Sequence, residues 1–99
     1  MTQSEKDLYR AALDTFGPDK QMVKYFEETA ELQKELCKNV LGLADNEAQI
    51  AEEIADVLIT LGQQIVRYDC ELAVAYIKAM KEERLWDYIR AMADDARGN

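Results

Sequence analysis

The chain has 99 residues, of which 20 are acidic, 12 are basic and none is histidine, so its formal net charge is −8. This length predicts a single domain, 1–99. The acidic balance argues against nucleic acid and against an anionic membrane as partners, because phosphate-rich surfaces are bound by basic residues. The absence of histidine excludes Ser-His-Asp and Cys-His catalysis and di-iron sites built from Glu-x-x-His units. Carboxylates, lysines or a metal ion would have to carry any catalysis.

The cysteines and the hydropathy indicate where the protein works. The two cysteines, Cys37 and Cys70, form no CxxC pair, and without histidine they cannot make a structural zinc site. We interpret them as free thiols, which predicts a reducing, cytoplasmic location. No apolar run approaches the ~20 residues of a membrane span, and no signal peptide is recognised at the start of the chain.

The first half of the chain predicts two helices. The first is expected over about 4–16, with Ser4 as its N-cap and Asp7 in its first turn, and the sequence "FGPD" ends it. The second is expected over about 19–41, because its apolar residues recur with a helical period.

The second half predicts two more helices. The third follows "LADN", with Asp45 or Asn46 as its N-cap, and is expected over about 47–68. Its apolar residues cover roughly 200° of the helical wheel, which is wider than one packed face needs. Gly62, in mid-helix, suggests close contact with another helix. The fourth helix is expected over about 71–92, with a bend or break at "KEER", where the apolar period slips.

Together these elements predict an all-α, four-helix bundle without strands. The segment 1–17 is expected to be an N-terminal helix, 18–92 to hold the core helices, and 93–99 to be a frayed tail.

Two pairs of acidic residues are the main functional signal. Glu28 and Glu31 are three residues apart on the second helix, and Glu53 and Asp56 are three apart on the third. Residues at this spacing are neighbours on a helix surface, and a short loop makes the two helices antiparallel neighbours. We therefore expect the pairs to face each other. Such a cluster needs protonation or a divalent cation, and oxygen ligands alone favour Mg²⁺ or Mn²⁺, with Ca²⁺ as a substitute.

Two simpler interpretations stay open beside a metal site. An acidic chain contains such pairs by chance, and most exposed glutamates only solvate a helix. An acidic strip on an otherwise apolar helix needs partners, however, and Lys24 and Arg67 could provide them in a structural ion-pair network.

The acidic pairs and their surroundings resemble a known family. "ETAE" (28–31) lies within "QMVKYFEETAELQKEL", and "EIAD" (53–56) lies within "EEIADVLITLGQQI". Over about 16–84 the chain is similar to the MazG-like nucleotide pyrophosphohydrolases. These all-α enzymes form a superfamily with the dimeric dUTPases and the phosphoribosyl-ATP pyrophosphohydrolases.

The resemblance implies a function and a set of site residues. It implies that Glu28, Glu31, Glu53 and Asp56 hold Mg²⁺, and that the protein hydrolyses nucleoside triphosphates to monophosphate and pyrophosphate, with one of these acids as general base. It also implies that subunits pair through the third helix, as a homodimer or homotetramer. Further residues are candidates for binding substrate: Gln21, Lys24, Lys78, Lys81 and Arg84.

Two other functions remain open at this point. Phosphoribosyl-ATP pyrophosphohydrolases share the acidic pattern, so this activity is an alternative within the enzyme class. A non-catalytic helical dimer that serves as an interaction module is the alternative outside it. The preferred nucleotide is not predicted.

Overall fold

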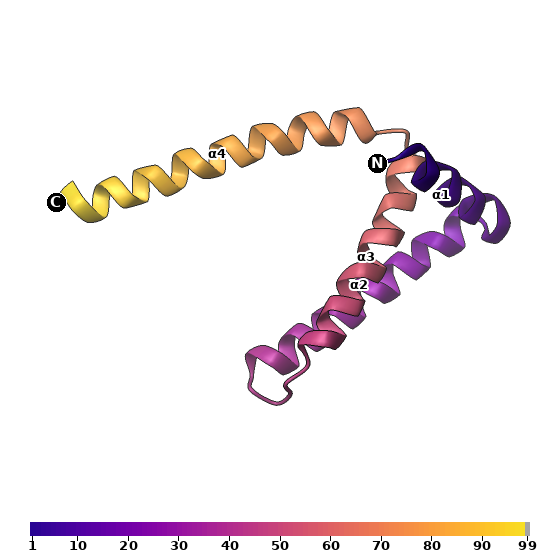
Figure 1. Ribbon diagram of the computed structural model, residues 1–99, viewed down its shortest axis with the longest axis horizontal. Helices are drawn as coiled ribbons and strands as arrows, with labels where there is room; N and C mark the ends of the chain where they lie inside the picture. The colour runs from indigo at the N-terminus through magenta and orange to yellow at the C-terminus, as the bar shows by residue number, and fades with distance from the viewer. Residues whose placement is uncertain (99) are drawn as a thin grey trace. The chain divides into compact units, whose positions relative to one another are not determined.

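The computed structural model describes residues 1–98, and over this range it contains four helices and no strand. They are α1 (Gln3–Phe16), α2 (Pro18–Val40), α3 (Glu47–Arg67) and α4 (Glu71–Gly98), as Figure 1 shows. The prediction of an all-α fold with four helices is therefore confirmed. The chain divides into two compact units, Met1–Asp69 with α1 to α3, and Cys70–Asn99 with α4.

The start of α1 differs from the sequence-based expectation. Thr2 is the N-cap: its Oγ1 accepts a hydrogen bond from the Glu5 amide at 3.1 Å, and Glu5 Oε1 accepts one from the Thr2 amide at 2.9 Å. The prediction of Ser4 with Asp7 as the cap was wrong. The reciprocal capping box needs a side chain long enough to reach back over a turn, and the glutamate satisfies this better than an aspartate.

A single glycine separates α1 from α2. Gly17 has φ 95°, a conformation that other residues rarely adopt, and it both ends α1 and precedes α2. Pro18 then occupies the first turn of α2, where its missing amide proton costs no helical hydrogen bond.

The first unit is built on an antiparallel pair, α2 and α3, with α1 packed across it (Figure 1). The buried apolar residues of this unit are Tyr9 and Leu13, both from α1. A Cβ atom added at Gly62 of α3 would lie 2.5 Å from Tyr9 Cε2. The close helix contact expected at Gly62 is thus confirmed, and the partner is α1.

The most buried side chains of α2 and α3 are polar, whereas much of the apolar surface of these helices is exposed. Apart from Gly62, the buried residues of the two helices are Glu28, Glu53, Thr60, Gln63 and Gln64. On α3, four large apolar side chains are 38–60% exposed: Ile54, Leu58, Ile59 and Leu61. We call the polar contact between the two helices the α2–α3 seam.

The second unit is one continuous helix. α4 runs unbroken through "KEER" to Gly98, so the break considered there is absent and 93–98 is helical. None of its residues up to Gly98 is buried. In residues 1–98, no helix has the length and the apolar character needed to cross a membrane.

Candidate metal centre

Three of the four predicted acids come together in the α2–α3 seam. Glu28 comes from α2, and Glu53 and Asp56 come from α3. One carboxylate oxygen from each lies within 4.8 Å of the other two. The convergence follows from local geometry: Glu53 and Asp56 project from one side of α3 because they are three residues apart, and the antiparallel packing brings Glu28 opposite them.

The acids of this cluster are withdrawn from solvent. Glu28 is 9% exposed and Glu53 is 8% exposed, while Asp56 is half-buried. Ionised carboxylates at such positions need compensation by cations or hydrogen-bond donors, because burial removes the water that stabilises the charge. The partners of the three acids therefore decide what the cluster can do.

The protein itself supplies little compensation. Lys24 Nζ lies 3.1 Å from Glu28 Oε1, and this lysine side chain is 54% exposed. Hydrogen bonding to Glu28, followed by the charge of Glu28, raises the pKa of Lys24 above its ordinary value. Gln49 Nε2 donates a hydrogen bond to Glu53 Oε1 at 3.0 Å.

The donor set fits a hard divalent cation. Three carboxylates from two helices present only oxygen ligands, which suits Mg²⁺ or Mn²⁺ and offers no nitrogen or sulfur for softer metals. The side chain of Lys24 is 54% exposed, so its ammonium group could return to water if a divalent ion replaced it as the partner of the buried Glu28. The residues present are therefore compatible with a bound ion.

The fourth predicted acid stands apart from this group. Glu31 is exposed on α2, and it does not belong to the set of three whose oxygens converge. α2 is rotated about its axis so that Glu28 faces α3, and Glu31, about 60° further round the same helix, does not reach the cluster. Of the two residues considered for an ion-pair network, Arg67 lies elsewhere, because its Nη2 contacts Asp19 Oδ1 at 3.0 Å.

Beyond the acids, three further polar residues of α3 are buried, and one of them, Gln63, contacts α2. Thr60 Oγ1 donates to the Asp56 carbonyl oxygen at 2.9 Å, and Gln21 Nε2 donates to Gln63 Oε1 at 2.6 Å. Gln64 is 7% exposed, and within the described residues its amide oxygen and nitrogen have no hydrogen-bond partner. Sequence reasoning selected Gln21 but missed its partner. Gln63 lies seven residues after Asp56, two helical turns along the same face, and this spacing could have indicated it.

The remaining candidates for binding substrate belong to α4. Lys78 Nζ forms an ion pair with Glu82 Oε2 at 3.1 Å, as is common for residues four apart. Lys81 and Arg84 are exposed. Their assignment to phosphate binding stays a prediction.

Comparisons with models of protein families, with curated proteins and with solved structures find no match to this chain. The class of this protein is therefore given by its own fold and side chains. It is an all-α protein in which two antiparallel helices hold a largely buried cluster of three carboxylates.

Proposed function

We propose that this protein is a Mg²⁺-dependent nucleoside triphosphate pyrophosphohydrolase of the MazG-like kind, acting in the cytoplasm. The observation that carries the proposal is the meeting of Glu28, Glu53 and Asp56 in the α2–α3 seam, with oxygens within 4.8 Å of one another. Two of these acids are buried, and Lys24 is the cation beside them. A divalent ion would neutralise them and at the same time provide an attachment point for phosphates.

The proposed roles of the residues follow from charge and position. A bound Mg²⁺ or Mn²⁺ would supply charge neutralisation and a water of lowered pKa. Glu28, Glu53 and Asp56 would hold the ion, and Gln49 would keep the Glu53 carboxylate oriented through its hydrogen bond. Glu31 is exposed and would either complete the ligand set or accept the proton lost by the attacking water. The bond to pyrophosphate would break as the water oxygen bonds to phosphorus.

Positive and polar side chains would meet the rest of the substrate. Lys24 already lies at the carboxylates and is the first candidate to contact a phosphate. Gln21 lies two helical turns before Glu28 on the same side of α2, about 10 Å away by the rise of the helix. Lys78, Lys81 and Arg84 of α4 are proposed to bind phosphate as well.

We also propose that the bundle is completed by self-association as a homodimer or homotetramer. The support is the exposed apolar surface of α3, formed by Ile54, Leu58, Ile59 and Leu61. Exposed apolar surface of this extent on a small unit is typical of a protein–protein contact. A second copy packed on α3 would bury it.

The activity can be tested directly. The protein is incubated with Mg²⁺ and each NTP and dNTP, with phosphoribosyl-ATP as a separate substrate, and released pyrophosphate is assayed. We expect turnover of at least one nucleoside triphosphate. Asp56→Asn and Glu53→Gln should reduce it by about 100-fold or more, because metal ligands act together. Glu52→Gln is the matched control: Glu52 is exposed next to Glu53, and this variant should keep its activity.

A metal-binding measurement separates the proposal from the non-catalytic alternative. Mg²⁺ or Mn²⁺ should raise the melting temperature of the wild-type protein, because a ligand that binds only the folded state stabilises it. The rise should vanish in Asp56→Asn and persist in Glu52→Gln. Equal shifts in the two variants, together with no turnover of any nucleotide, would eliminate the proposed function.

A further inference from the structure

Gln64 is a buried amide of the first unit that lacks a partner. It is 7% exposed, and among residues 1–98 neither its amide oxygen nor its amide nitrogen has a hydrogen-bond partner. An unpaired polar group in the interior lowers stability, and such groups are few in native proteins. A methionine would fill the same space without this penalty. The amide is therefore expected to serve a group that the chain itself does not supply.

The position of Gln64 relates it to the candidate metal centre. It lies eleven residues after Glu53, about three helical turns, so the two side chains leave α3 on nearly the same side. Gln63 has a similar relation to Asp56, which lies seven residues, or about two turns, before it. Thus α3 carries two glutamines in line with its two acids, roughly 10 to 16 Å further along the helix axis by the helical rise.

The glutamines can be reached from the contact with α2. Gln21 Nε2 donates to Gln63 Oε1 at 2.6 Å, and Gln21 is half-buried, whereas Gln63 is 5% exposed. Because Gln21 already borders solvent, its amide can turn into water when a ligand takes its place. The ligand then meets Gln63 first, and Gln64 is the next residue of the chain.

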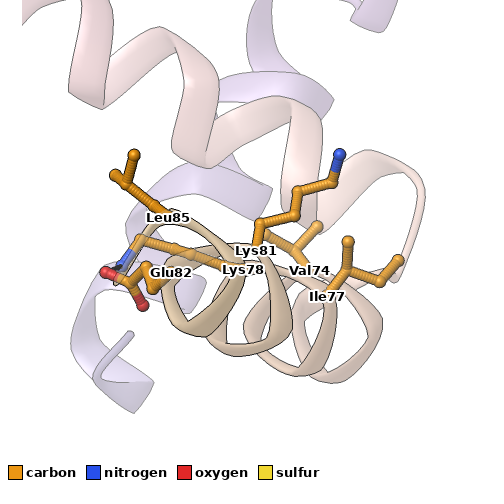
Figure 2. Close-up of a pocket in the computed structure, with 6 residues that line it drawn as sticks. All are labelled: Val74, Ile77, Lys78, Lys81, Glu82 and Leu85. Carbon is orange, nitrogen blue, oxygen red and sulfur yellow. Dashed lines mark hydrogen bonds and ion pairs between the residues drawn. The ribbon is translucent and has the colours of Figure 1, made fainter. Parts of the chain in front are cut away.

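The surface hollow of α4 offers no comparable group. It has a volume of about 410 Å³ and is lined by residues of this one helix (Figure 2): Val74, Ile77, Lys78, Lys81, Glu82 and Leu85. Two of its three charged residues, Lys78 and Glu82, already pair with each other. None of the residues of α4 up to Gly98 is buried. The unpaired amide of Gln64 is therefore the better indication of a ligand.

We propose that Gln63 and Gln64 recognise the base of a nucleotide whose phosphates are held at the metal centre. This inference rests on the proposed function and adds the part of the substrate that these residues contact. A carboxamide presents a donor beside an acceptor, and every nucleobase has an edge with an adjacent donor and acceptor. Phosphates carry acceptors only. The separation from the acids also fits, because an extended nucleotide places its base well away from its β- and γ-phosphates.

Binding of ligands with and without a base tests this assignment. Dissociation constants are measured by calorimetry in Mg²⁺ for α,β-imido nucleoside triphosphates, which resist cleavage at that bond, and for tripolyphosphate, which has no base. Wild type should bind at least one nucleotide about 10-fold or more tightly than tripolyphosphate. Gln64→Met keeps the length of the side chain and removes the amide. It should lose most of this preference, while its affinity for tripolyphosphate stays unchanged.

A stability measurement separates base recognition from a structural role of the amide. Without ligand, Gln64→Met should melt at a higher temperature than wild type, because it removes an unpaired buried amide. The matched control is Gln33→Met at an exposed position of α2, which should keep the nucleotide preference and the melting temperature of wild type. A lower melting temperature for Gln64→Met would show that the amide stabilises the fold, and would overturn the inference.

The binding data also distinguish failure of this inference from failure of the proposed function. Equal affinities of wild type for nucleotides and tripolyphosphate would overturn base recognition alone, since the metal centre would still hold phosphates. Equal weakening of both kinds of ligand in Gln64→Met would do the same. Absence of Mg²⁺-dependent binding of every compound would eliminate the proposed function and this inference together.

Discussion

Gly62 of α3 has only a hydrogen atom as its side chain, and this allows α1 to approach α3 closely. Tyr9 is 7% exposed, and its ring lies where a Cβ atom at this position would be, 2.5 Å from Cε2. A buried ring cannot move aside without disturbing the packing around it. A glycine in mid-helix lowers the intrinsic stability of α3, but here it allows the close contact between α1 and α3.

Gly62→Ala should destabilise the protein by about 1–3 kcal/mol, because it overpacks the contact with Tyr9. At an unhindered helix position the same change would stabilise the protein by about 0.5–1 kcal/mol. The sign of the change in the free energy of unfolding therefore shows whether position 62 is hindered. Urea unfolding measures the difference. Combined with Tyr9→Leu, which removes the ring, Gly62→Ala should become neutral or stabilising. A stabilising effect in the presence of Tyr9 would contradict the close contact.

Residues of the candidate site could be predicted from the sequence only where their spacing along a helix places them on the same face. Glu53 and Asp56 share a helix face, and Glu28 was expected opposite them, as the cluster confirms. Which member of the Glu28 and Glu31 pair faces α3 depends on the rotation of α2 about its axis. That rotation is set by packing against α1 and α3, which sequence periodicity does not resolve to within 60°.

At the scale of elements, the α2–α3 connection is held by side chains. Asn46 Nδ2 donates to Glu35 Oε2 at 2.6 Å and to the Glu35 carbonyl oxygen at 3.0 Å, while Asn39 donates to Asn46 Oδ1 at 3.2 Å. Asp45 or Asn46 was expected as the N-cap of α3, and Asn46 occupies that position. It precedes the helix, but its side chain bridges back to α2 instead of bonding an amide of α3.

This bridge predicts a pH dependence of stability. The hydrogen bond from Asn46, assisted by Lys38, lowers the pKa of Glu35 below its ordinary value of 4.5. Because the folded state holds the carboxylate ionised, the stability it contributes is complete above that value and is lost as the pH falls through the lower pKa of the folded state. Glu35→Gln should therefore lower the melting temperature at neutral pH, and its difference from wild type should shrink as the pH falls below 4.5.

The same exchange at the exposed Glu83 serves as the control for this measurement. It removes one negative charge without touching the connection, and its effect should be small at neutral pH. A difference between Glu35→Gln and wild type that stays constant across the acid range would show that the charge of Glu35 plays no part.

The sequence predicted the existence of each helix more reliably than the residues at which the helix begins and ends. The four helices were predicted from apolar period and terminating residues, and α3 agrees within a residue or two. At "KEER" the slip in period suggested a break, yet α4 continues. Lysine, glutamate and arginine are strong helix formers, so the slip changes which side of the helix is apolar and leaves the backbone helical.

At the scale of the whole molecule, the first unit has too few buried apolar residues to account for a stable fold. Tyr9 and Leu13 are its buried apolar residues, whereas even small domains bury about 60% of the surface of their unfolded chain. Self-association would supply the missing burial. The wide apolar arc of α3 in the sequence favours this proposal, but the sequence does not reveal which surfaces of two copies would be complementary.

The melting temperature should therefore rise with protein concentration, because association that occurs only between folded chains stabilises them by mass action. Thermal unfolding followed by circular dichroism over about a 100-fold dilution series measures it. Glu83→Lys changes an exposed residue of α4, away from the apolar surface of α3, and should show the same slope as wild type. A melting temperature that does not change over the series would mean that the monomer is stable alone, and would count against assembly.

The ion pair between Lys24 and Glu28 has a consequence for the order of events in the proposed enzyme. In the absence of a divalent ion the lysine occupies one corner of the carboxylate cluster. A divalent ion held by Glu28 would displace the ammonium group of Lys24, and this group could then contact an anionic substrate. Ion and nucleotide would then each strengthen the hold on the other, a reciprocity required by thermodynamic linkage. Lys24 would thus pair with Glu28 before the ion binds and with the anionic substrate afterwards.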